Sequence, residues 1–249
     1  MPRLTVIVIT RNEAANIGAC LDSVAFADER IVVDANSDDG TAAIAAAKGA
    51  RVVTRTFDGF GAQKNFALAQ AQGDWVLSID ADERVTPELR AAIERAMARP
   101  DADAYEVSRL SSFCGRQMNH SGWFPDYVLR LFRRGRARFS DDIVHERVVS
   151  DGKVGRLTGA LLHEPVVRLE QALSRVDRYS TAGAEMLIAK GRRVSFMSGI
   201  GHGLWAFLRT YILRAGFLDG REGFLLAVAN AEGTYYRYMK AWLAGRRRD

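Results

Sequence analysis

The sequence predicts an α/β protein with a mostly parallel central sheet flanked by helices, followed by a helical C-terminal region. Short apolar runs rich in β-branched residues alternate with segments whose apolar residues recur at helical spacing. The runs are apolar throughout, which is typical of parallel strands covered on both faces. At 249 residues and 48% hydrophobic composition, the chain is long enough to bury a large core.

The expected strands and helices alternate through residue 108. Strands are expected over 4–9, 30–34, 51–55, 74–80 and 104–108. Helices are expected over 13–24, over the Ala-rich stretch 41–48, within 59–73 and after Pro87. Shorter strand-like pieces follow, and from about residue 167 the pattern becomes helical. We therefore expect a sheet-based domain over 1–166 and a helical region over 167–249.

Positive charge is concentrated in the C-terminal third. Residues 174–249 hold 13 Lys and Arg against 6 Asp and Glu, a net charge of +7, whereas residues 1–173 hold 22 against 24, a net charge of −2. Such asymmetry is typical of binding to nucleic acid, to an anionic membrane surface or to an anionic substrate. No nucleic-acid recognition module is recognisable, so we expect no nucleic-acid partner.

The cysteines and the N-terminus indicate a cytoplasmic protein. Cys20 and Cys114 are the only cysteines, and two distant cysteines suit neither a disulfide framework nor a metal knuckle. The first apolar run is followed by polar residues without a small-residue cleavage site, which is a poor match to a signal peptide.

Polar side chains follow three of the expected strands. Thr10 to Glu13 follow the first, Asp34 follows the second, and Asp80 with Asp82 follows the fourth. Ligands bind at the carboxyl ends of such strands, and residues i and i+2 point to the same side about 7 Å apart. Asp80 and Asp82 can therefore address one ligand, and a hard cation carrying a diphosphate would suit them. The alternative is an ordinary solvated turn.

Four stretches resemble the inverting glycosyltransferases of family 2, which have the GT-A fold. They are VIVITRNEAANI at 6–17, VVDANSDDGT at 32–41, GAQKNFALAQAQGDWVLSIDADERV at 61–85 and RLFRRGRARFSDDIVHERV at 130–148. More closely, the chain is similar to the lipopolysaccharide core glucosyltransferases of the WaaE/KdtX type, including YILRAGFLDGREGF at 211–224. The QxxRW motif of processive enzymes is absent, which argues against a polymerising synthase.

The resemblance implies a nucleotide-sugar site. Thr10 and Glu13 would border the base, and Asp34 would bond the base or ribose. Lys64 would reach the diphosphate as a compact charge. Turn formation and helix capping are the alternative for the first three residues, and a solvated helix lysine is the alternative for Lys64.

A divalent cation, Mg²⁺ or Mn²⁺, is also implied, with Asp82 as its principal ligand and Asp80 facing the ribose and metal. His163 would complete the diphosphate or metal site, or else be a structural histidine. The reaction needs a base, for which we favour Glu146, with Asp142 second; the alternative for Glu146 is an ion pair that only orients an arginine.

Acceptor recognition is assigned to Trp123 for stacking on a sugar, Asp126 for its hydroxyls, and Arg130 at the start of a basic run that suits phosphorylated saccharides. Core packing is the alternative for Trp123. Farther on, residues 194–208 contain no Asp, Glu, Lys or Arg, but 15 residues fall short of the roughly 20 that span a bilayer. We expect either an interfacial helix or a buried helix that packs on the sheet-based domain or on another subunit.

The resemblance implies an enzyme that transfers one sugar, glucose from UDP-glucose, to a lipid-linked saccharide such as the inner core of lipopolysaccharide. Its place would be the inner face of the cytoplasmic membrane, as a peripheral protein, and a homo-oligomer is compatible with the sequence. One alternative is a sugar nucleotidyltransferase, although ITRNEAANI is not the Gly-rich basic loop expected of one. The other is a non-catalytic glycan-binding or membrane-scaffolding protein of the same fold.

Overall fold

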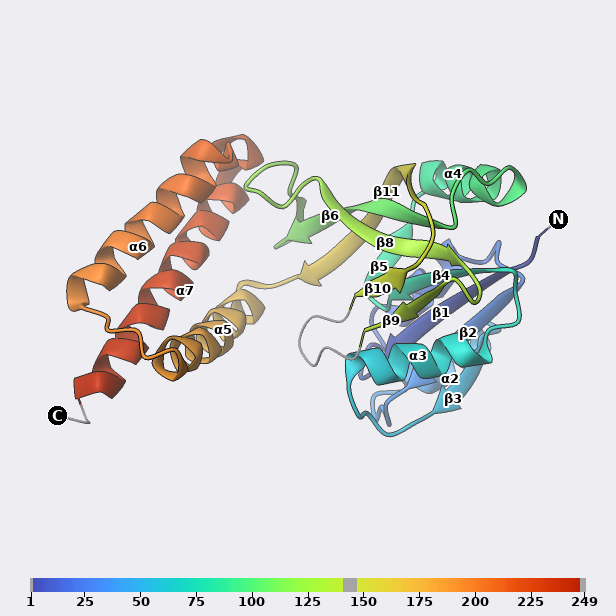
Figure 1. Cartoon of the computed structure of the whole chain (residues 1–249), viewed down its shortest axis with the longest axis horizontal. Coiled ribbons are helices and arrows are strands. Elements are labelled where there is room, and N and C mark those ends of the chain that lie inside the picture. The colour runs from blue at the N-terminus through green and yellow to red at the C-terminus, as the bar shows by residue number, and fades with distance from the viewer. Residues whose placement is uncertain (1, 141–146, 247–249) are drawn as a thin grey trace. The chain divides into compact units, whose positions relative to one another are not determined.

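Residues 2–140 and 147–246 are described by the computed structural model of this chain (Figure 1). In chain order the strands are β1 (Leu4–Thr10), β2 (Glu29–Asp34), β3 (Arg51–Thr54), β4 (Trp75–Asp80), β5 (Glu83–Val85), β6 (Ala104–Phe113), β7 (Arg116–Gln117), β8 (Asp126–Arg133), β9 (Ala137–Phe139), β10 (Val148–Ser150) and β11 (Val154–Val166). The helices are α1 (Ile17–Ser23), α2 (Thr41–Ala47), α3 (Phe60–Gln70), α4 (Pro87–Ala98), α5 (Leu169–Ala189), α6 (Phe196–Leu208) and α7 (Gly220–Arg246). A π-helical turn, η1 (Arg209–Leu213), and a 3-10 turn, η2 (Gly216–Asp219), lie between α6 and α7.

Within the described residues, nine strands form one sheet in the order β3-β2-β1-β4-β8-β6-β11-β5, with β7 beside β6. β3, β2, β1 and β4 are parallel neighbours, whereas β8 runs antiparallel to β4 and β5 antiparallel to β11. The register pairs Thr10 with Asp34 and Ile9 with Asp80. The predicted fold class is confirmed, and the carboxyl ends of β1, β2 and β4 meet at one edge.

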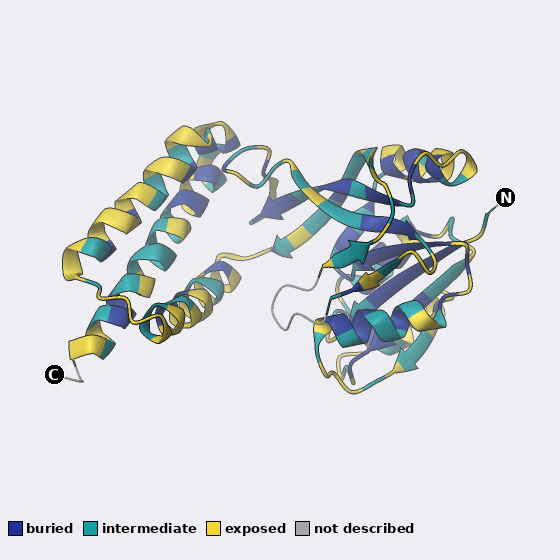
Figure 2. Ribbon diagram, in the orientation of Figure 1, coloured by how far each residue is buried: buried dark blue, intermediate teal, exposed yellow. Residues whose placement is uncertain are grey.

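The core lies on both faces of the parallel strands because side chains alternate along β1. Val6 and Val8 belong to a cluster that includes residues of α1 and α4, whereas Ile7 belongs to a second cluster that includes Ala67 of α3. β1, β2 and β4 are accordingly buried along most of their length, whereas β3, at the edge of the sheet, is not (Figure 2). This arrangement explains why their sequences are continuously apolar.

Helix α4 shows how local sequence fixes an element. Thr86 precedes it in an extended conformation, and its Oγ1 accepts a hydrogen bond from the N–H of Leu89 at 3.2 Å. Pro87 follows at the first helical position, where its missing N–H costs nothing. Leu89, Ala92, Ile93 and Ala96 are buried along one stripe. The helix therefore begins at the predicted proline.

The chain divides into two compact units, one comprising Met1–Arg109 with Asp126–His163 and the other Leu110–Pro125 with Glu164–Asp249. The first unit ends at His163, and the domain boundary at residue 166 stays a prediction. Residues 110–125, however, group with the C-terminal helices, which the sequence pattern did not indicate. The unit that carries the parallel strands holds the strand ends described above.

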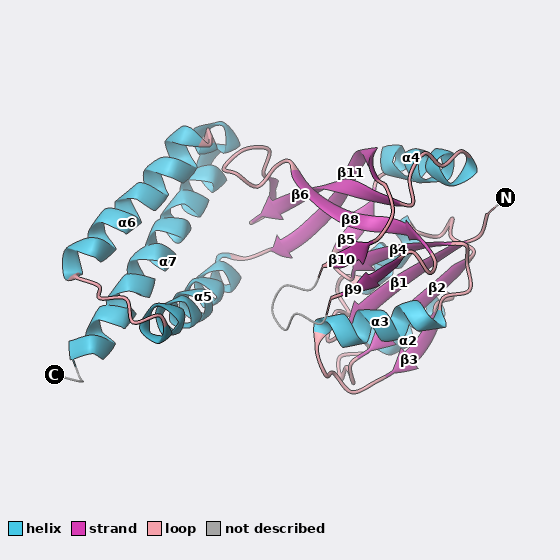
Figure 3. Cartoon of the chain, viewed as in Figure 1, coloured by secondary structure: helices cyan, strands magenta, loops and turns pink. Residues whose placement is uncertain are grey.

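The helical unit contains α5, α6 and α7 (Figure 3). Phe113 and Met118 form a buried cluster with Leu226 of α7. The buried carboxylate of Asp219 accepts hydrogen bonds from the N–H groups of Asn119 and His120 and from other donors of that loop. Among the described residues no helix is both long and apolar enough to cross a membrane.

Candidate active site

The loops after β1 and β2 are joined by polar contacts. The N–H of Asn12 donates to Oγ of Ser37 at 2.8 Å, and the N–H of Asp38 donates to Oδ1 of Asn12 at 3.0 Å. Asp34 is buried and accepts a hydrogen bond from the N–H of Ser37 at 2.9 Å. Oγ1 of Thr10 is buried and has no hydrogen-bond partner among the described residues. Because a buried hydroxyl normally has a partner, Thr10 is available to a ligand at this edge.

Glu13 is part of the same edge and is half-buried. Its N–H donates to Oγ1 of Thr41 at 2.8 Å, and its carboxylate accepts a hydrogen bond from Nδ2 of Asn16 at 2.7 Å. Burial raises the pKa of Glu13; the bond from Asn16 opposes this, and the negative charge of Asp82 adds to it. Glu13 therefore lies within the electrostatic influence of Asp82, which follows β4.

Asp80, at the end of β4, lies between two cations. Nζ of Lys64, on α3, is 3.0 Å from its Oδ1, and Nη2 of Arg130, on β8, is 2.7 Å from its Oδ2. Burial alone would raise the pKa of Asp80, but the charges of Arg130 and Lys64 outweigh it and hold the pKa well below its usual range. Asp80 is thus an anion whose two oxygens already contact protein cations, so a metal ion would compete for them.

Glu83 shares Arg130 with Asp80. The Glu83 side chain is fully buried, its Oε1 lies 2.6 Å from Nη2 of Arg130, and its Oε2 accepts the N–H of Asp80 at 2.9 Å. Nη1 of Arg109 is 3.7 Å from Oε1. Burial raises the pKa of Glu83, with Arg130 opposing and Asp80 adding to the shift. This network fixes the turn that carries Asp82.

Asp82 and His163 form the pair of side chains best suited to a divalent cation. Oδ2 of Asp82 is 3.4 Å from Nε2 of His163, which lies on β11 opposite Glu83 of β5. Two ligands with metal bonds of 2.0–2.2 Å at a right angle lie about 3 Å apart, so this spacing fits one ion. Carboxylate and imidazole together suit Mn²⁺. No cluster of three or more His, Cys, Asp or Glu for a metal occurs among the described residues, so the other ligands would come from a bound diphosphate and water.

Two of the three predicted acceptor residues, Asp126 and Arg130, are linked through Arg109 and Glu83. Arg130 is buried in the ion pairs just described. Asp126, which begins β8, accepts two hydrogen bonds from Arg109, at 2.9 and 2.6 Å. Trp123 belongs to the helical unit and packs edge-on against Phe113, with ring centroids 5.9 Å apart, as its packing alternative expected. Their roles toward an acceptor stay predictions.

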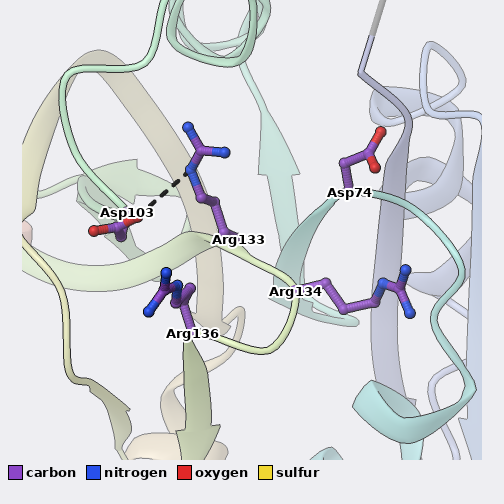
Figure 4. Close-up of a pocket in the computed structure, with 5 residues that line it drawn as sticks. All are labelled: Asp74, Asp103, Arg133, Arg134 and Arg136. Atoms are coloured by element: carbon purple, nitrogen blue, oxygen red, sulfur yellow. Dashed lines mark ion pairs between the residues drawn. The ribbon is translucent and has the colours of Figure 1, made fainter.

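The basic run after Arg130 surrounds a separate cavity of about 370 Å³. It is lined by Asp74, Asp103, Arg133, Arg134 and Arg136 (Figure 4). Asp74 directly precedes β4 and Asp80 ends it, which at about 3.3 Å per residue separates the two by about 20 Å. The guanidinium group of Arg133 lies over the Trp75 ring, and its Nε is 3.5 Å from Asp103. This cavity is therefore remote from the acids at the carboxyl edge.

The predicted bases, Glu146 and Asp142, lie outside the residues that the structure describes. Their assignment stays a prediction from sequence.

Sequence reasoning assigned no role to Arg109 or to Glu83, which lies within the stretch 61–85 quoted above. A usable signal did exist for the network: Arg130 interrupts the apolar run VLRLF at 128–132. A charge inside a strand that is otherwise buried requires a partner, and here the partners are Asp80 and Glu83. The interrupted apolar run predicts that a buried ion pair exists, but it does not predict which acids form it.

The carboxyl edge of this partly parallel sheet gathers acids, an unpartnered hydroxyl, a lysine and an arginine. This arrangement is that of a glycosyltransferase with the GT-A fold. Residues 5–151 match the family model described as glycosyl transferase family 2, which is more than half of the chain. The chain therefore belongs to glycosyl transferase family 2, and the predicted family is confirmed.

Several relatives are similar to nearly the whole chain. The lipopolysaccharide core biosynthesis glycosyltransferase LpsC of Rhizobium meliloti is 34% identical over 252 residues, which cover 96% of this chain and 90% of the relative. An uncharacterized glycosyltransferase of Rickettsia typhi is 32% identical and covers 96% of this chain and 87% of the relative. Mannosyl-3-phosphoglycerate synthase from Rubrobacter xylanophilus, a solved structure, is 28% identical with a TM-score of 0.38, over 45% of this chain and 40% of that one. Similarity over the full length is thus to bacterial glycosyltransferases.

Proposed function

We propose that this protein is an inverting glycosyltransferase that moves one sugar from a UDP-sugar, with glucose the favoured sugar, to a lipid-linked saccharide of the lipopolysaccharide core. It would act as a peripheral protein at the cytoplasmic face of the membrane. The observation that carries the proposal is the Asp82–His163 pair at 3.4 Å beside the cations around Asp80. The acceptor class is supported by the similarity to LpsC over 96% of the chain.

The residues at the carboxyl edge have complementary tasks in this reaction. The nucleoside would be held by Thr10, Glu13 and Asp34. Oγ1 of Thr10, which has no hydrogen-bond partner among the described residues, would supply one hydrogen bond. Lys64 and Arg130 would keep Asp80 ionised and in place. Asp82 and His163 would hold a divalent cation, which when bound supplies positive charge to the departing diphosphate.

The transfer makes one bond and breaks another. The acceptor hydroxyl oxygen attacks the anomeric carbon from the face opposite the leaving group, and the bond from that carbon to the UDP oxygen breaks with its electron pair on UDP. The hydroxyl proton passes to a base, for which Glu146 is the first choice and Asp142 the second. One displacement of this kind inverts the anomeric configuration.

The test is release of UDP from UDP-glucose with Mn²⁺ or Mg²⁺ and lipopolysaccharide truncated within its inner core. We expect UDP release that requires the acceptor, and a product one hexose heavier by mass spectrometry. Other UDP-hexoses and intact lipopolysaccharide serve as controls for donor and acceptor. Pyrophosphate release from UTP and a sugar phosphate would instead indicate a nucleotidyltransferase, and tight glycan binding without any turnover would indicate a binding protein.

A separate prediction concerns the base. Glu146→Gln is expected to leave UDP-glucose binding intact and to lower kcat by roughly a hundredfold or more, as expected when a general base is removed. Binding is followed by calorimetry and kcat by UDP release. Asp142→Asn is the matched variant: if it abolishes turnover while Glu146→Gln turns over normally, the base is Asp142.

A further inference from the structure

Within the described residues, the helical unit carries a stripe of exposed apolar side chains. On α6, Met197, Ile200, Leu204 and Leu208 follow one another at intervals of three or four residues, and Ile212 of η1 continues the row. Leu213 follows Leu208 by five residues, which is about one π-helical turn. All six side chains are exposed, with Met197 and Leu213 each at 66% and Leu204 at 60%. Residues at this spacing share one side of a helix. We refer to these six residues as the α6 stripe.

The other side of α6 shows that the stripe is not a poorly packed core. Gly199 and Gly203 are buried on the side that faces α7. A Cβ added to Gly199 would lie 2.3 Å from Cε of Met239, and one added to Gly203 would lie 3.2 Å from Cβ of Tyr235. The two helices therefore approach closely through glycines, and α6 has one side packed on α7 and one exposed side (Figure 2), whose large side chains are apolar. Contiguous exposed apolar area of this kind marks an interaction surface.

The charges of the segment that contains the stripe favour an anionic partner. Residues 186–218 contain five basic residues, Lys190, Arg192, Arg193, Arg209 and Arg214, and no Asp or Glu. An anionic lipid surface complements both features, because the basic groups meet head groups while the apolar side chains enter the boundary of the acyl chains. A twofold contact with a second copy would bring the same surface against itself, and this segment has no acids to pair with its arginines.

We propose that the α6 stripe is the membrane-binding surface of this protein and that it inserts into the head-group region of an anionic bilayer. Trp205, exposed beside the stripe at 53%, is placed to enter the interface, where tryptophan is favoured. The proposal assigns membrane binding to one surface within the positively charged C-terminal third. It also adds insertion of apolar side chains to the attraction between charges. It does not depend on the donor or acceptor proposed above, because it is tested without either.

The test is co-sedimentation of the full-length protein with vesicles of phosphatidylcholine alone or mixed with phosphatidylglycerol. Leu204→Asp/Leu213→Asp is compared with Tyr179→Asp/Met186→Asp on α5, where the exposures are 60% and 59%, so both variants add two acids at equally exposed apolar positions. We expect the parent to prefer anionic vesicles and the stripe variant to lose at least about tenfold in partition coefficient. The α5 variant is expected to stay within roughly threefold of the parent, since its added charges lie on α5 and not on the α6 stripe.

Equal losses in the two variants would overturn the assignment and leave a general charge attraction. Absence of binding by the parent would also overturn it. If the stripe variant binds vesicles normally but changes the molar mass measured by light scattering, a second copy covers the stripe instead. Circular dichroism of both variants confirms that they fold.

A second readout is tryptophan emission. Trp205 is exposed, whereas Trp75 is buried, so insertion of the stripe is expected to shift the parent's emission to the blue on addition of anionic vesicles. Trp205→Phe keeps an aromatic ring and is expected to co-sediment like the parent while losing that shift. A full shift in Trp205→Phe would contradict insertion at this position.

Discussion

Asp82→Asn is expected to lower transferase activity by at least about a hundredfold, because an amide oxygen lacks the charge needed to hold a hard cation against a diphosphate. Stability is expected to change by no more than about 1 kcal/mol, since Asp82 is partly exposed and its ion pair with His163 depends on protonation of the imidazole. Activity is measured by UDP release, and Mn²⁺ binding in the presence of UDP is measured by calorimetry.

The matched control for Asp82→Asn is Asp151→Asn, the same change at an exposed acid, which is expected to leave both measurements unchanged. His163→Asn is expected to weaken Mn²⁺ binding by about tenfold or more, if the imidazole is the second ligand. Mn²⁺–UDP binding as tight in Asp82→Asn as in the parent would remove Asp82 from the metal site.

The strand ends were predictable from the sequence because their determinants are local. The run from Val6 to Ile9 is β-branched and apolar, and it forms the centre of β1. The following helix was expected from residue 13 but begins at Ile17, because the N–H groups of Asn16 and Ile17 both turn back to the carbonyl oxygen of Glu13. Periodicity thus located the elements, while turn chemistry decided where the helix starts.

The partners of the acids were not predictable, because distant segments supply them. Arg130 is 50 residues from Asp80 in sequence, and His163 meets Asp82 only because β11 pairs with β5. The antiparallel pairings of β8 with β4 and of β11 with β5 cannot be read from the periodicity of the strands themselves. The same reason explains residues 110–125, where the N–H groups of Asn119 and His120 donate to the buried carboxylate of Asp219 in η2, 100 and 99 residues away in sequence.

Arg130→Met is expected to lower the free energy of unfolding of the sheet-bearing unit by about 3 kcal/mol, because it leaves Asp80 and the fully buried Glu83 without their shared cation. This value is at the low end of the range expected when one partner of a buried ion pair is removed. Lys64 and Arg109 remain near the two acids, and the Asp80 side chain keeps 32% exposure, so solvent screens part of its charge. In thermal unfolding this corresponds to a fall in Tm of roughly 6–12 °C.

Arg133→Met, the same substitution three residues along β8, is the control. The Arg133 side chain is 43% exposed and its ion pair with Asp103 is long, at 3.5 Å, so its loss is expected to cost about 1 kcal/mol or less. Adding Glu83→Gln to Arg130→Met removes one stranded charge and is expected to restore part of the stability. Equal stability of Arg130→Met and Arg133→Met would show that the buried network contributes little.

The cost of Arg130→Met is also expected to depend on pH. The folded-state pKa of Asp80 lies below its ordinary value, so the stability that its ionised form contributes is present above the unfolded pKa of about 3.9 and is lost as pH falls through the folded pKa. Burial raises the pKa of Glu83, so Glu83 takes up its proton first and gives up its charged contact with Arg130 at a higher pH than Asp80 does. The difference in unfolding free energy between parent and Arg130→Met, measured in urea, should therefore be largest near neutral pH and shrink on acidification. A difference that grows on acidification would mean that Arg130 acts through packing and not through these two carboxylates.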